Sequence, residues 1–153
     1  MKTLVVYYSR TGQTRKIALD IAEKLKAEID EIQDSKNRKG FWGYLWAGAD
    51  AVKKSLTEIE FSKNPEDFDL VVLGSPTWAG RMAPAIRTYL TKNNLQNCAF
   101  FCTAGGKGYG NVLSELMELN LSAKIVAKIG LSGKNIKQGF EEKLKEFTST
   151  IKG

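Results

Sequence analysis

Hydroxyl-bearing side chains gather in one short segment near the N-terminus, residues 9–14, and could bind an anion there. The hydroxyl groups of Ser9, Thr11 and Thr14 can each donate a hydrogen bond to a phosphate oxygen. Gly12 lets the backbone turn and approach a ligand without an intervening side chain. The segment lacks both the Gly-Lys-Ser/Thr of a P-loop and the three spaced glycines of a dinucleotide-binding loop. We therefore expect it to hold a terminal monophosphate.

The flanking residues predict that this hydroxyl-rich segment is a turn between a strand and a helix. Residues 4–8 form a continuous apolar run, which is typical of a buried strand in a parallel sheet. Apolar residues then recur with the spacing of one helix face: Ile17, Ala18, Ile21, Ala22 and Leu25. A helix that begins near Gln13 would direct unpaired backbone N–H groups and the positive end of its dipole at the segment. Capping of this helix by the Ser and Thr side chains is the alternative interpretation.

A second segment that could contact a ligand, residues 75–80, follows the apolar strand pattern of residues 68–74. Ligands of open parallel sheets bind at the carboxyl ends of the strands, so this segment should lie beside the first one. Trp78 is then in a position to stack on a flat ring, and a Trp buried in the core is the alternative. The helix pattern that follows has Pro84 in its first turn, where proline is acceptable.

A third segment, residues 104–110, follows a predicted strand at residues 98–103 and contains four glycines. Its backbone can approach a ligand closely and hydrogen-bond the polar edge of a flat ring. Tyr109 is a candidate for the second aromatic wall, and a solvent-exposed position in the loop is the alternative. Lys107 is a candidate partner for negative charge on the ligand.

The first segment resembles the Ser/Thr-x-Thr-Gly-x-Thr loop with which flavodoxins hold the phosphate of FMN, because Ser9, Thr11, Gly12 and Thr14 match it. The Thr-Trp pair of the second segment matches the position where many flavodoxins flank the isoalloxazine ring with an aromatic side chain. The resemblance covers the whole chain and implies a short-chain flavodoxin-like protein with FMN as cofactor. We assign no catalytic residue and no metal site. The residues indicated as cofactor-binding are Ser9, Arg10, Thr11, Gly12, Gln13, Thr14, Pro76, Thr77, Trp78, Ala79, Gly80, Thr103, Ala104, Gly105, Gly106 and Tyr109.

Five strand patterns alternate with helix patterns, which is typical of an α/β fold with a parallel sheet. Residues 27–34 show a weak strand pattern and residues 122–131 alternate apolar with basic residues, so both predict edge strands. A closing helix is predicted from one apolar stripe: Phe140, Leu144, Phe147 and Ile151. We expect one flavodoxin-like domain over residues 1–153, with a five-stranded parallel sheet of order 2-1-3-4-5 and helices on both faces.

The most aromatic part of the chain, residues 41–46, leads into a further helix pattern. Its apolar residues recur at intervals of three and four: Trp42, Leu45, Ala49, Val52 and Leu56. We expect this stripe to pack on the sheet, and a lip over the flavin or a partner-docking surface are the alternatives. Basic residues flank the segment: Lys36, Arg38, Lys39, Lys53 and Lys54. They also permit association with a membrane surface through an amphipathic helix, which we do not favour.

The composition is that of a globular protein whose redox chemistry must come from a cofactor. The chain has 153 residues, of which 42% are hydrophobic and 26% charged, and these values suit one domain with a sizeable core. There is no His, and two Cys alone cannot form a structural zinc site. Cys98 and Cys102 fall in one predicted strand, too far apart to form a disulfide. Neither a signal-peptide pattern nor a membrane-spanning run occurs, so the cytoplasm is the expected compartment.

The formal net charge of +6 differs from that of the acidic electron carriers among flavodoxins. A basic surface favours redox protein partners with acidic surfaces. The lysines are scattered through nearly every segment, however, so a solvated surface is the simpler explanation and no nucleic-acid partner is expected. The oligomeric state stays open.

The resemblance implies electron transfer through FMN, with an FMN-dependent NAD(P)H oxidoreductase acting on quinones or similar acceptors as the alternative. No nicotinamide-binding element is identifiable, which disfavours the reductase. A doubly wound module without cofactor is disfavoured because no acidic cluster ends the strands.

The redox properties implied by the resemblance depend on residue types in the three segments. Many flavodoxins have Gly where this chain has Ala79, and alanine tolerates positive φ less readily. A backbone flip on flavin reduction is therefore expected to be harder, unless Gly80 takes over that role. Arg10, Arg81 and Lys107 stand where acidic residues would disfavour the reduced anion, so we expect a less strongly reducing flavin.

Overall fold

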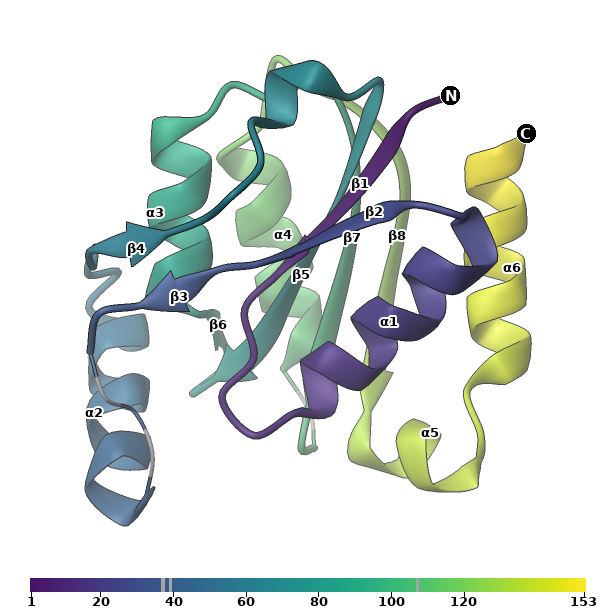
Figure 1. Ribbon diagram of the computed structural model, residues 1–153. Helices are drawn as coiled ribbons and strands as arrows, with labels where there is room; N and C mark the ends of the chain where they lie inside the picture. Colours follow the sequence, from purple (N-terminus) through teal and green to yellow (C-terminus); the bar gives the residue numbers. More distant parts are fainter. Residues whose placement is uncertain (37, 39, 107) are drawn as a thin grey trace.

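The computed structural model describes residues 1–36, 38, 40–106 and 108–153, and its centre is a parallel sheet between two layers of helices (Figure 1). Five parallel strands follow the order β2-β1-β5-β7-β8. Their bounds are Thr3–Tyr7 for β1, Glu28–Glu31 for β2, Leu70–Trp78 for β5, Asn97–Ala104 for β7 and Lys124–Ser132 for β8. The α/β fold and the predicted order 2-1-3-4-5 are thereby confirmed.

Helices cover both faces of this sheet, with α1 and α6 on one face and α3 and α4 on the other (Figure 1). The helices are α1 Gln13–Leu25, α2 Gly40–Val52, α3 Pro84–Lys92, α4 Tyr109–Glu118, α5 Gly133–Gln138 and α6 Glu141–Lys152. Side chains of β1 alternate between two cores, as a strand with two covered faces requires. Leu4 and Val6 lie in the core under α3 and α4, and Val5 and Tyr7 lie in the core under α1 and α6. The predicted stripe of the closing helix is buried in the second of these cores.

Short elements extend the predicted pattern around the sheet. A separate antiparallel pair is formed by β3, Gln33–Asp34, and β4, Ile59–Glu60. A short strand β6, Arg81–Met82, pairs antiparallel with the end of β5. The turn at residues 65–67 is a 3-10 turn. Because pairing with β6 and β7 continues to the end of β5, residues 75–78 are strand and not the predicted loop.

Helix α2 turns its large apolar side chains toward solvent, so the prediction that they pack on the sheet is wrong. The exposed residues here are Trp42, Leu45, Trp46, Val52 and, beyond the helix, Leu56. Its buried positions carry small residues: Gly43, Ala47 and Ala51. A Cβ on Gly43 would overlap the backbone of Arg38, so only a small-residue face allows this close approach. The apolar residues of α2 do recur with the predicted helical spacing, but they face solvent and not the sheet.

The two cysteines, Cys98 and Cys102, are free and fully buried in β7. Burial raises the pKa of the Cys98 thiol to about 11 and that of Cys102 to about 12. The prediction of two unbridged core thiols is confirmed. Both are protonated at neutral pH and act as small apolar side chains.

Gly74 in β5 lies directly against the ring of Phe101 in β7, and a Cβ at this position would overlap that ring. We expect Gly74→Ala to lower the free energy of unfolding by about 1–3 kcal/mol, because the ring is fully buried and tightly packed. Gly110→Ala is the matched control, since nothing lies within 4 Å of a Cβ there and alanine favours helix α4. Urea unfolding measures both effects. A Gly74→Ala protein as stable as the wild type would contradict the described packing.

Candidate functional site

The three segments singled out in the sequence meet at the carboxyl ends of β1, β5 and β7, where they enclose a cavity of about 380 Å³. Its lining residues are Arg10, Thr11, Gln13, Thr14, Tyr44, Pro76, Thr77, Trp78, Ala79, Gly80, Thr103, Ala104, Gly105 and Gly106. Of the residues expected to bind a cofactor, Ser9, Gly12 and Tyr109 do not line this cavity. Lys107 lies outside the described residues. Among the described lining residues, Tyr44 is the one that the sequence did not single out.

The hydroxyl-rich loop is shaped by its own side chains. The backbone N–H of Gly12 donates to Ser9 Oγ at 3.0 Å, and Gly12 has a φ of 98° just before α1. No side chain caps α1, so capping by Ser or Thr does not explain these residues. The hydroxyls of Thr14 and Thr103 are hydrogen-bonded at 2.8 Å, which joins the first loop to the end of β7. The backbone N–H groups of the first turn of α1 have no partner within the helix and stay available to an anion.

The second loop is a tight hairpin in which Thr77 pairs with Met82 and Trp78 with Arg81. Its two central residues, Ala79 and Gly80, have φ values of 49° and 73°. Such positive values at both positions match the twist of the flanking strands. Ala79 therefore already holds the left-handed conformation that alanine disfavours by about 1–2 kcal/mol, which the hairpin pairing must offset.

Trp78 forms part of the cavity wall but is only 8% exposed. Its ring meets Tyr8 edge to face, with centroids 5.4 Å apart. The guanidinium of Arg38 lies over the ring, 5.3 Å from the centroid. The ring is thus largely a core side chain, as the alternative interpretation proposed, and one side of it is covered by a cation.

The second aromatic residue that lines the cavity, beside Trp78, is Tyr44 and not Tyr109. The ring of Tyr109 packs against Gly130, where a Cβ would overlap it. Tyr44 comes from α2 and lines the cavity, with the guanidinium of Arg10 lying 5.4 Å from its ring centroid. The aromatic segment therefore includes a lip of the cavity, one of the alternatives for residues 41–46. The sequence did contain a signal for Tyr44, because this aromatic residue does not belong to the apolar stripe of its own helix.

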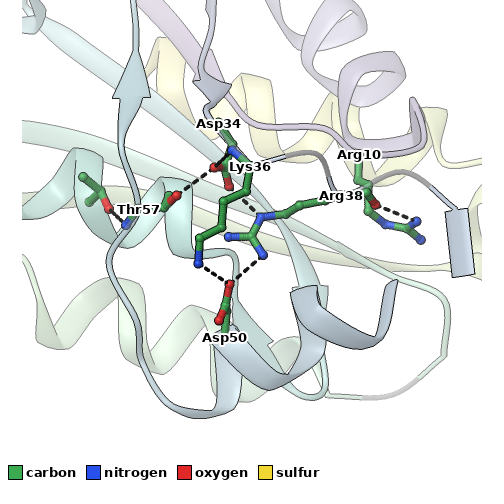
Figure 2. Close-up of polar contacts among 7 residues, drawn as sticks. Arg10, Asp34, Lys36, Arg38, Asp50 and Thr57 are labelled. Carbon is green, nitrogen blue, oxygen red and sulfur yellow. Dashed lines mark hydrogen bonds and ion pairs between the residues drawn. The ribbon is translucent and has the colours of Figure 1, made fainter. Parts of the chain in front are cut away.

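A buried ion-pair network holds α2 beside the cavity (Figure 2). The side chain of Arg38 is 2% exposed, and its Nε donates to Asp34 Oδ2 at 2.7 Å and its Nη1 to Asp50 Oδ2 at 2.9 Å. Lys36 reaches Asp50 at 3.0 Å, and Thr57 donates its hydroxyl to the other oxygen of Asp34. Arg38, which the sequence grouped with the basic residues that flank the aromatic segment, is therefore a buried and paired side chain.

The network connects directly to the first loop and to the aromatic wall. Arg10 donates to the backbone carbonyl of Arg38 at 3.5 Å (Figure 2). Burial alone would lower the pKa of Arg38, but the hydrogen bonds to Asp34 and Asp50 raise it. The guanidinium over Trp78 thus stays charged, and α2, β3 and the cavity wall are held together by one cation.

At the hairpin, the buried carboxylate of Glu115 compensates the positive charge of arginine side chains. Glu115 in α4 accepts from Arg81 at 3.0 Å and also pairs with Arg87. Arg81 is therefore not a free cation beside the cavity, contrary to its grouping with Arg10 in the sequence. Within the part of the chain that the structure describes, no cluster of His, Cys, Asp and Glu could hold a metal ion.

Comparisons with known proteins agree on the fold. No family model and no curated protein matches the sequence. A flavoprotein from Lactobacillus acidophilus NCFM in complex with FMN is 25% identical, with a TM-score of 0.73, over 90% of this chain and 97% of that chain. A mutant flavodoxin from Pseudomonas aeruginosa is 13% identical over 100% of both chains, with a TM-score of 0.61. The two-electron reduced flavodoxin of Megasphaera elsdenii is 15% identical over 97% of this chain and 98% of that chain, with a TM-score of 0.62. The fold is therefore flavodoxin-like.

The Asp50 carboxylate should make the stability of this region depend on pH. Burial alone would raise the pKa of Asp50, but the hydrogen bonds from Lys36 and Arg38 outweigh it and lower the pKa. A depressed pKa stabilises the folded state above the ordinary carboxyl pKa, and this contribution is lost as pH falls through the folded-state value.

We expect Asp50→Asn to lower the free energy of unfolding at neutral pH, with the difference from wild type narrowing as the pH falls below the ordinary carboxyl pKa of about 3.9. Urea unfolding at a series of pH values measures this gap. Glu118→Gln, at an exposed position of α4, is the control and should show a small gap at every pH. A gap for Asp50→Asn that is unchanged in acid would contradict the network.

Proposed function

We propose that this protein binds FMN between the three loops and transfers electrons through it. One observation carries the proposal: the hydroxyl-rich loop, the Trp78 hairpin and the glycine-rich loop line a single cavity. That cavity lies at the carboxyl edge of a parallel sheet, where ligands bind in folds of this kind. The similarity to the L. acidophilus flavoprotein in complex with FMN supports the choice of cofactor.

The groups that line the cavity suit the two ends of this cofactor. The volume of about 380 Å³ falls within the range of ligand sites. The hydroxyl-rich loop and the first turn of α1 suit the phosphate. Within the described chain, the buried Thr77 Oγ1 has no hydrogen-bond partner. A buried hydroxyl without a partner is costly, and a polar edge of the cofactor would satisfy it.

The side chains around the cavity would bind and orient FMN, which supplies the redox chemistry when bound. Arg10 brings positive charge to the phosphate end, and the backbone of Ala104, Gly105 and Gly106 offers hydrogen-bonding groups at the other wall. Tyr44 would shield one side of the ring from water. Ser9 and Gly12 act indirectly, by shaping the loop.

Thr11 gives a direct test of the phosphate end, because it lines the cavity and is exposed. We expect Thr11→Val to weaken FMN binding about tenfold or more, since a hydrogen bond to a charged group contributes about 1.5–3 kcal/mol. Quenching of FMN fluorescence on titration measures the dissociation constant. Thr150→Val, which removes an exposed hydroxyl from α6, is the control and should leave the affinity unchanged. Equal affinity of the two variants would count against this phosphate site.

Electron transfer with protein partners is the role that the cavity lining favours. Among the described lining residues Arg10 is the one charged side chain, and neither a carboxylate nor a histidine lines the cavity to move protons for a second substrate. The net charge of +6 favours redox partners with acidic surfaces. The two free buried cysteines are in keeping with a reducing compartment, and we propose the cytoplasm.

A second cavity supports the alternative, an FMN-dependent NAD(P)H oxidoreductase acting on quinones or similar acceptors. This cavity of about 530 Å³ lies between α2 and the hairpin, and most of its lining is apolar. It shares Tyr44, Thr77, Trp78 and Ala79 with the first cavity. An apolar acceptor bound there would lie next to the proposed flavin.

Anaerobic mixing of the FMN-loaded protein with NADH or NADPH separates the two roles. For an electron carrier we expect the yellow flavin absorbance to persist with either nucleotide and to bleach on addition of dithionite. Rapid bleaching by a nicotinamide nucleotide, followed by recovery when a quinone is added, would instead establish the reductase.

A further inference from the structure

The outer face of α2, formed by Trp42, Leu45, Trp46, Ala49 and Val52, is an unusual surface. These positions lie on one side of the helix, opposite the small buried residues. Among the described residues, ten large hydrophobic side chains are exposed, and six of them fall within residues 42–56. Exposed apolar side chains are thus concentrated on this part of the molecule, as at interaction sites.

Two tryptophans dominate this outer face. Trp42 is 67% exposed and Trp46 is 64% exposed, four residues apart and therefore on adjacent turns. Tryptophan is enriched, together with tyrosine, at membrane–water interfaces, where its amphipathic ring lies at the level of the headgroups. Figure 1 shows α2 at the margin of the molecule, so its outer face can approach a flat surface.

The charges around the outer face are positive. Lys53 and Lys54 follow the helix directly and both are exposed. The single acidic residue of α2, Asp50, is already paired with Arg38 and Lys36. The helix therefore presents apolar side chains and cations together, without a carboxylate free to repel an anionic surface.

We propose that the outer face of α2 docks on an anionic lipid surface. Trp42, Leu45 and Trp46 enter the headgroup region, and Lys53 and Lys54 pair with anionic headgroups. The helix lies along the surface, since it has 13 residues and no helix in the described chain is long and apolar enough to cross a membrane. Membrane association was not favoured from the sequence, and the exposure of Trp42, Leu45 and Trp46 now supports it.

A lipid surface suits these residues better than a second copy of the chain. A symmetric dimer through α2 would place Lys53 and Lys54 of both subunits in or beside one interface, and the single carboxylate of α2, Asp50, is already paired with Arg38 and Lys36. Each subunit also carries a net charge of +6, which opposes association. An anionic bilayer gains from the same charges. The proposal is independent of whether FMN is bound.

Co-sedimentation of the full-length protein with vesicles tests the proposal. We expect binding to vesicles of phosphatidylcholine mixed with phosphatidylglycerol, much weaker binding to phosphatidylcholine alone, and a loss of binding at high salt. Trp46→Ser should lower the partition coefficient about tenfold or more, because it removes a large exposed apolar side chain. Lys53→Glu should lower the partition coefficient at least about fivefold, since each lysine near an anionic surface strengthens binding by about that factor.

Matched controls change exposed residues on other elements. Leu121→Ser, at a position 88% exposed after α4, should bind vesicles like the wild type. Lys143→Glu on α6 should lower binding less than Lys53→Glu does. Thermal unfolding checks that the variants are folded. The proposal is overturned if the wild type does not bind anionic vesicles, if Trp46→Ser binds as well as Leu121→Ser, or if sedimentation shows a dimer that Trp46→Ser dissociates.

Discussion

Parallel pairing of β1, β5 and β7 is the constraint on which the candidate site depends. Strands that run in one direction end at one edge of the sheet, so the three following segments must meet. The hydrogen bond between Thr14 and Thr103 fastens the first of these segments to the third. Without this arrangement, residues distant in the sequence, such as Arg10, Trp78 and Gly105, could not line one cavity.

The buried guanidinium of Arg38 has a comparable role for the rest of the site. It pairs with Asp34 and Asp50 and covers Trp78, so it positions α2 next to the hairpin. Removing one partner of such a pair leaves a buried charge uncompensated, which costs about 3–5 kcal/mol. The position of Tyr44 at the cavity, and the outward direction of the α2 tryptophans, both follow from this attachment.

The sheet order, both edge strands and the helices that cover the sheet were predictable, because buried parallel strands leave continuous apolar runs and packed helices leave apolar stripes. The three segments that line the cavity were predictable from residue types at strand ends. The direction of α2 was not, since periodicity shows that a stripe exists but not what covers it. The small residues Gly43 and Ala47 and the buried role of Arg38 depend on long-range contacts. Long-range contacts also decide that Tyr44, and not Tyr109, lines the cavity.

The central claim is that three loops form one FMN site, and amide NMR of the labelled protein during FMN titration tests it most directly. The account predicts saturable shifts for backbone amides of Thr11, Gln13, Thr14 and Gly105 and for the Trp78 hairpin, with small shifts at the opposite end of the sheet. Absence of saturable shifts, or shifts confined to residues away from these three loops, would contradict it.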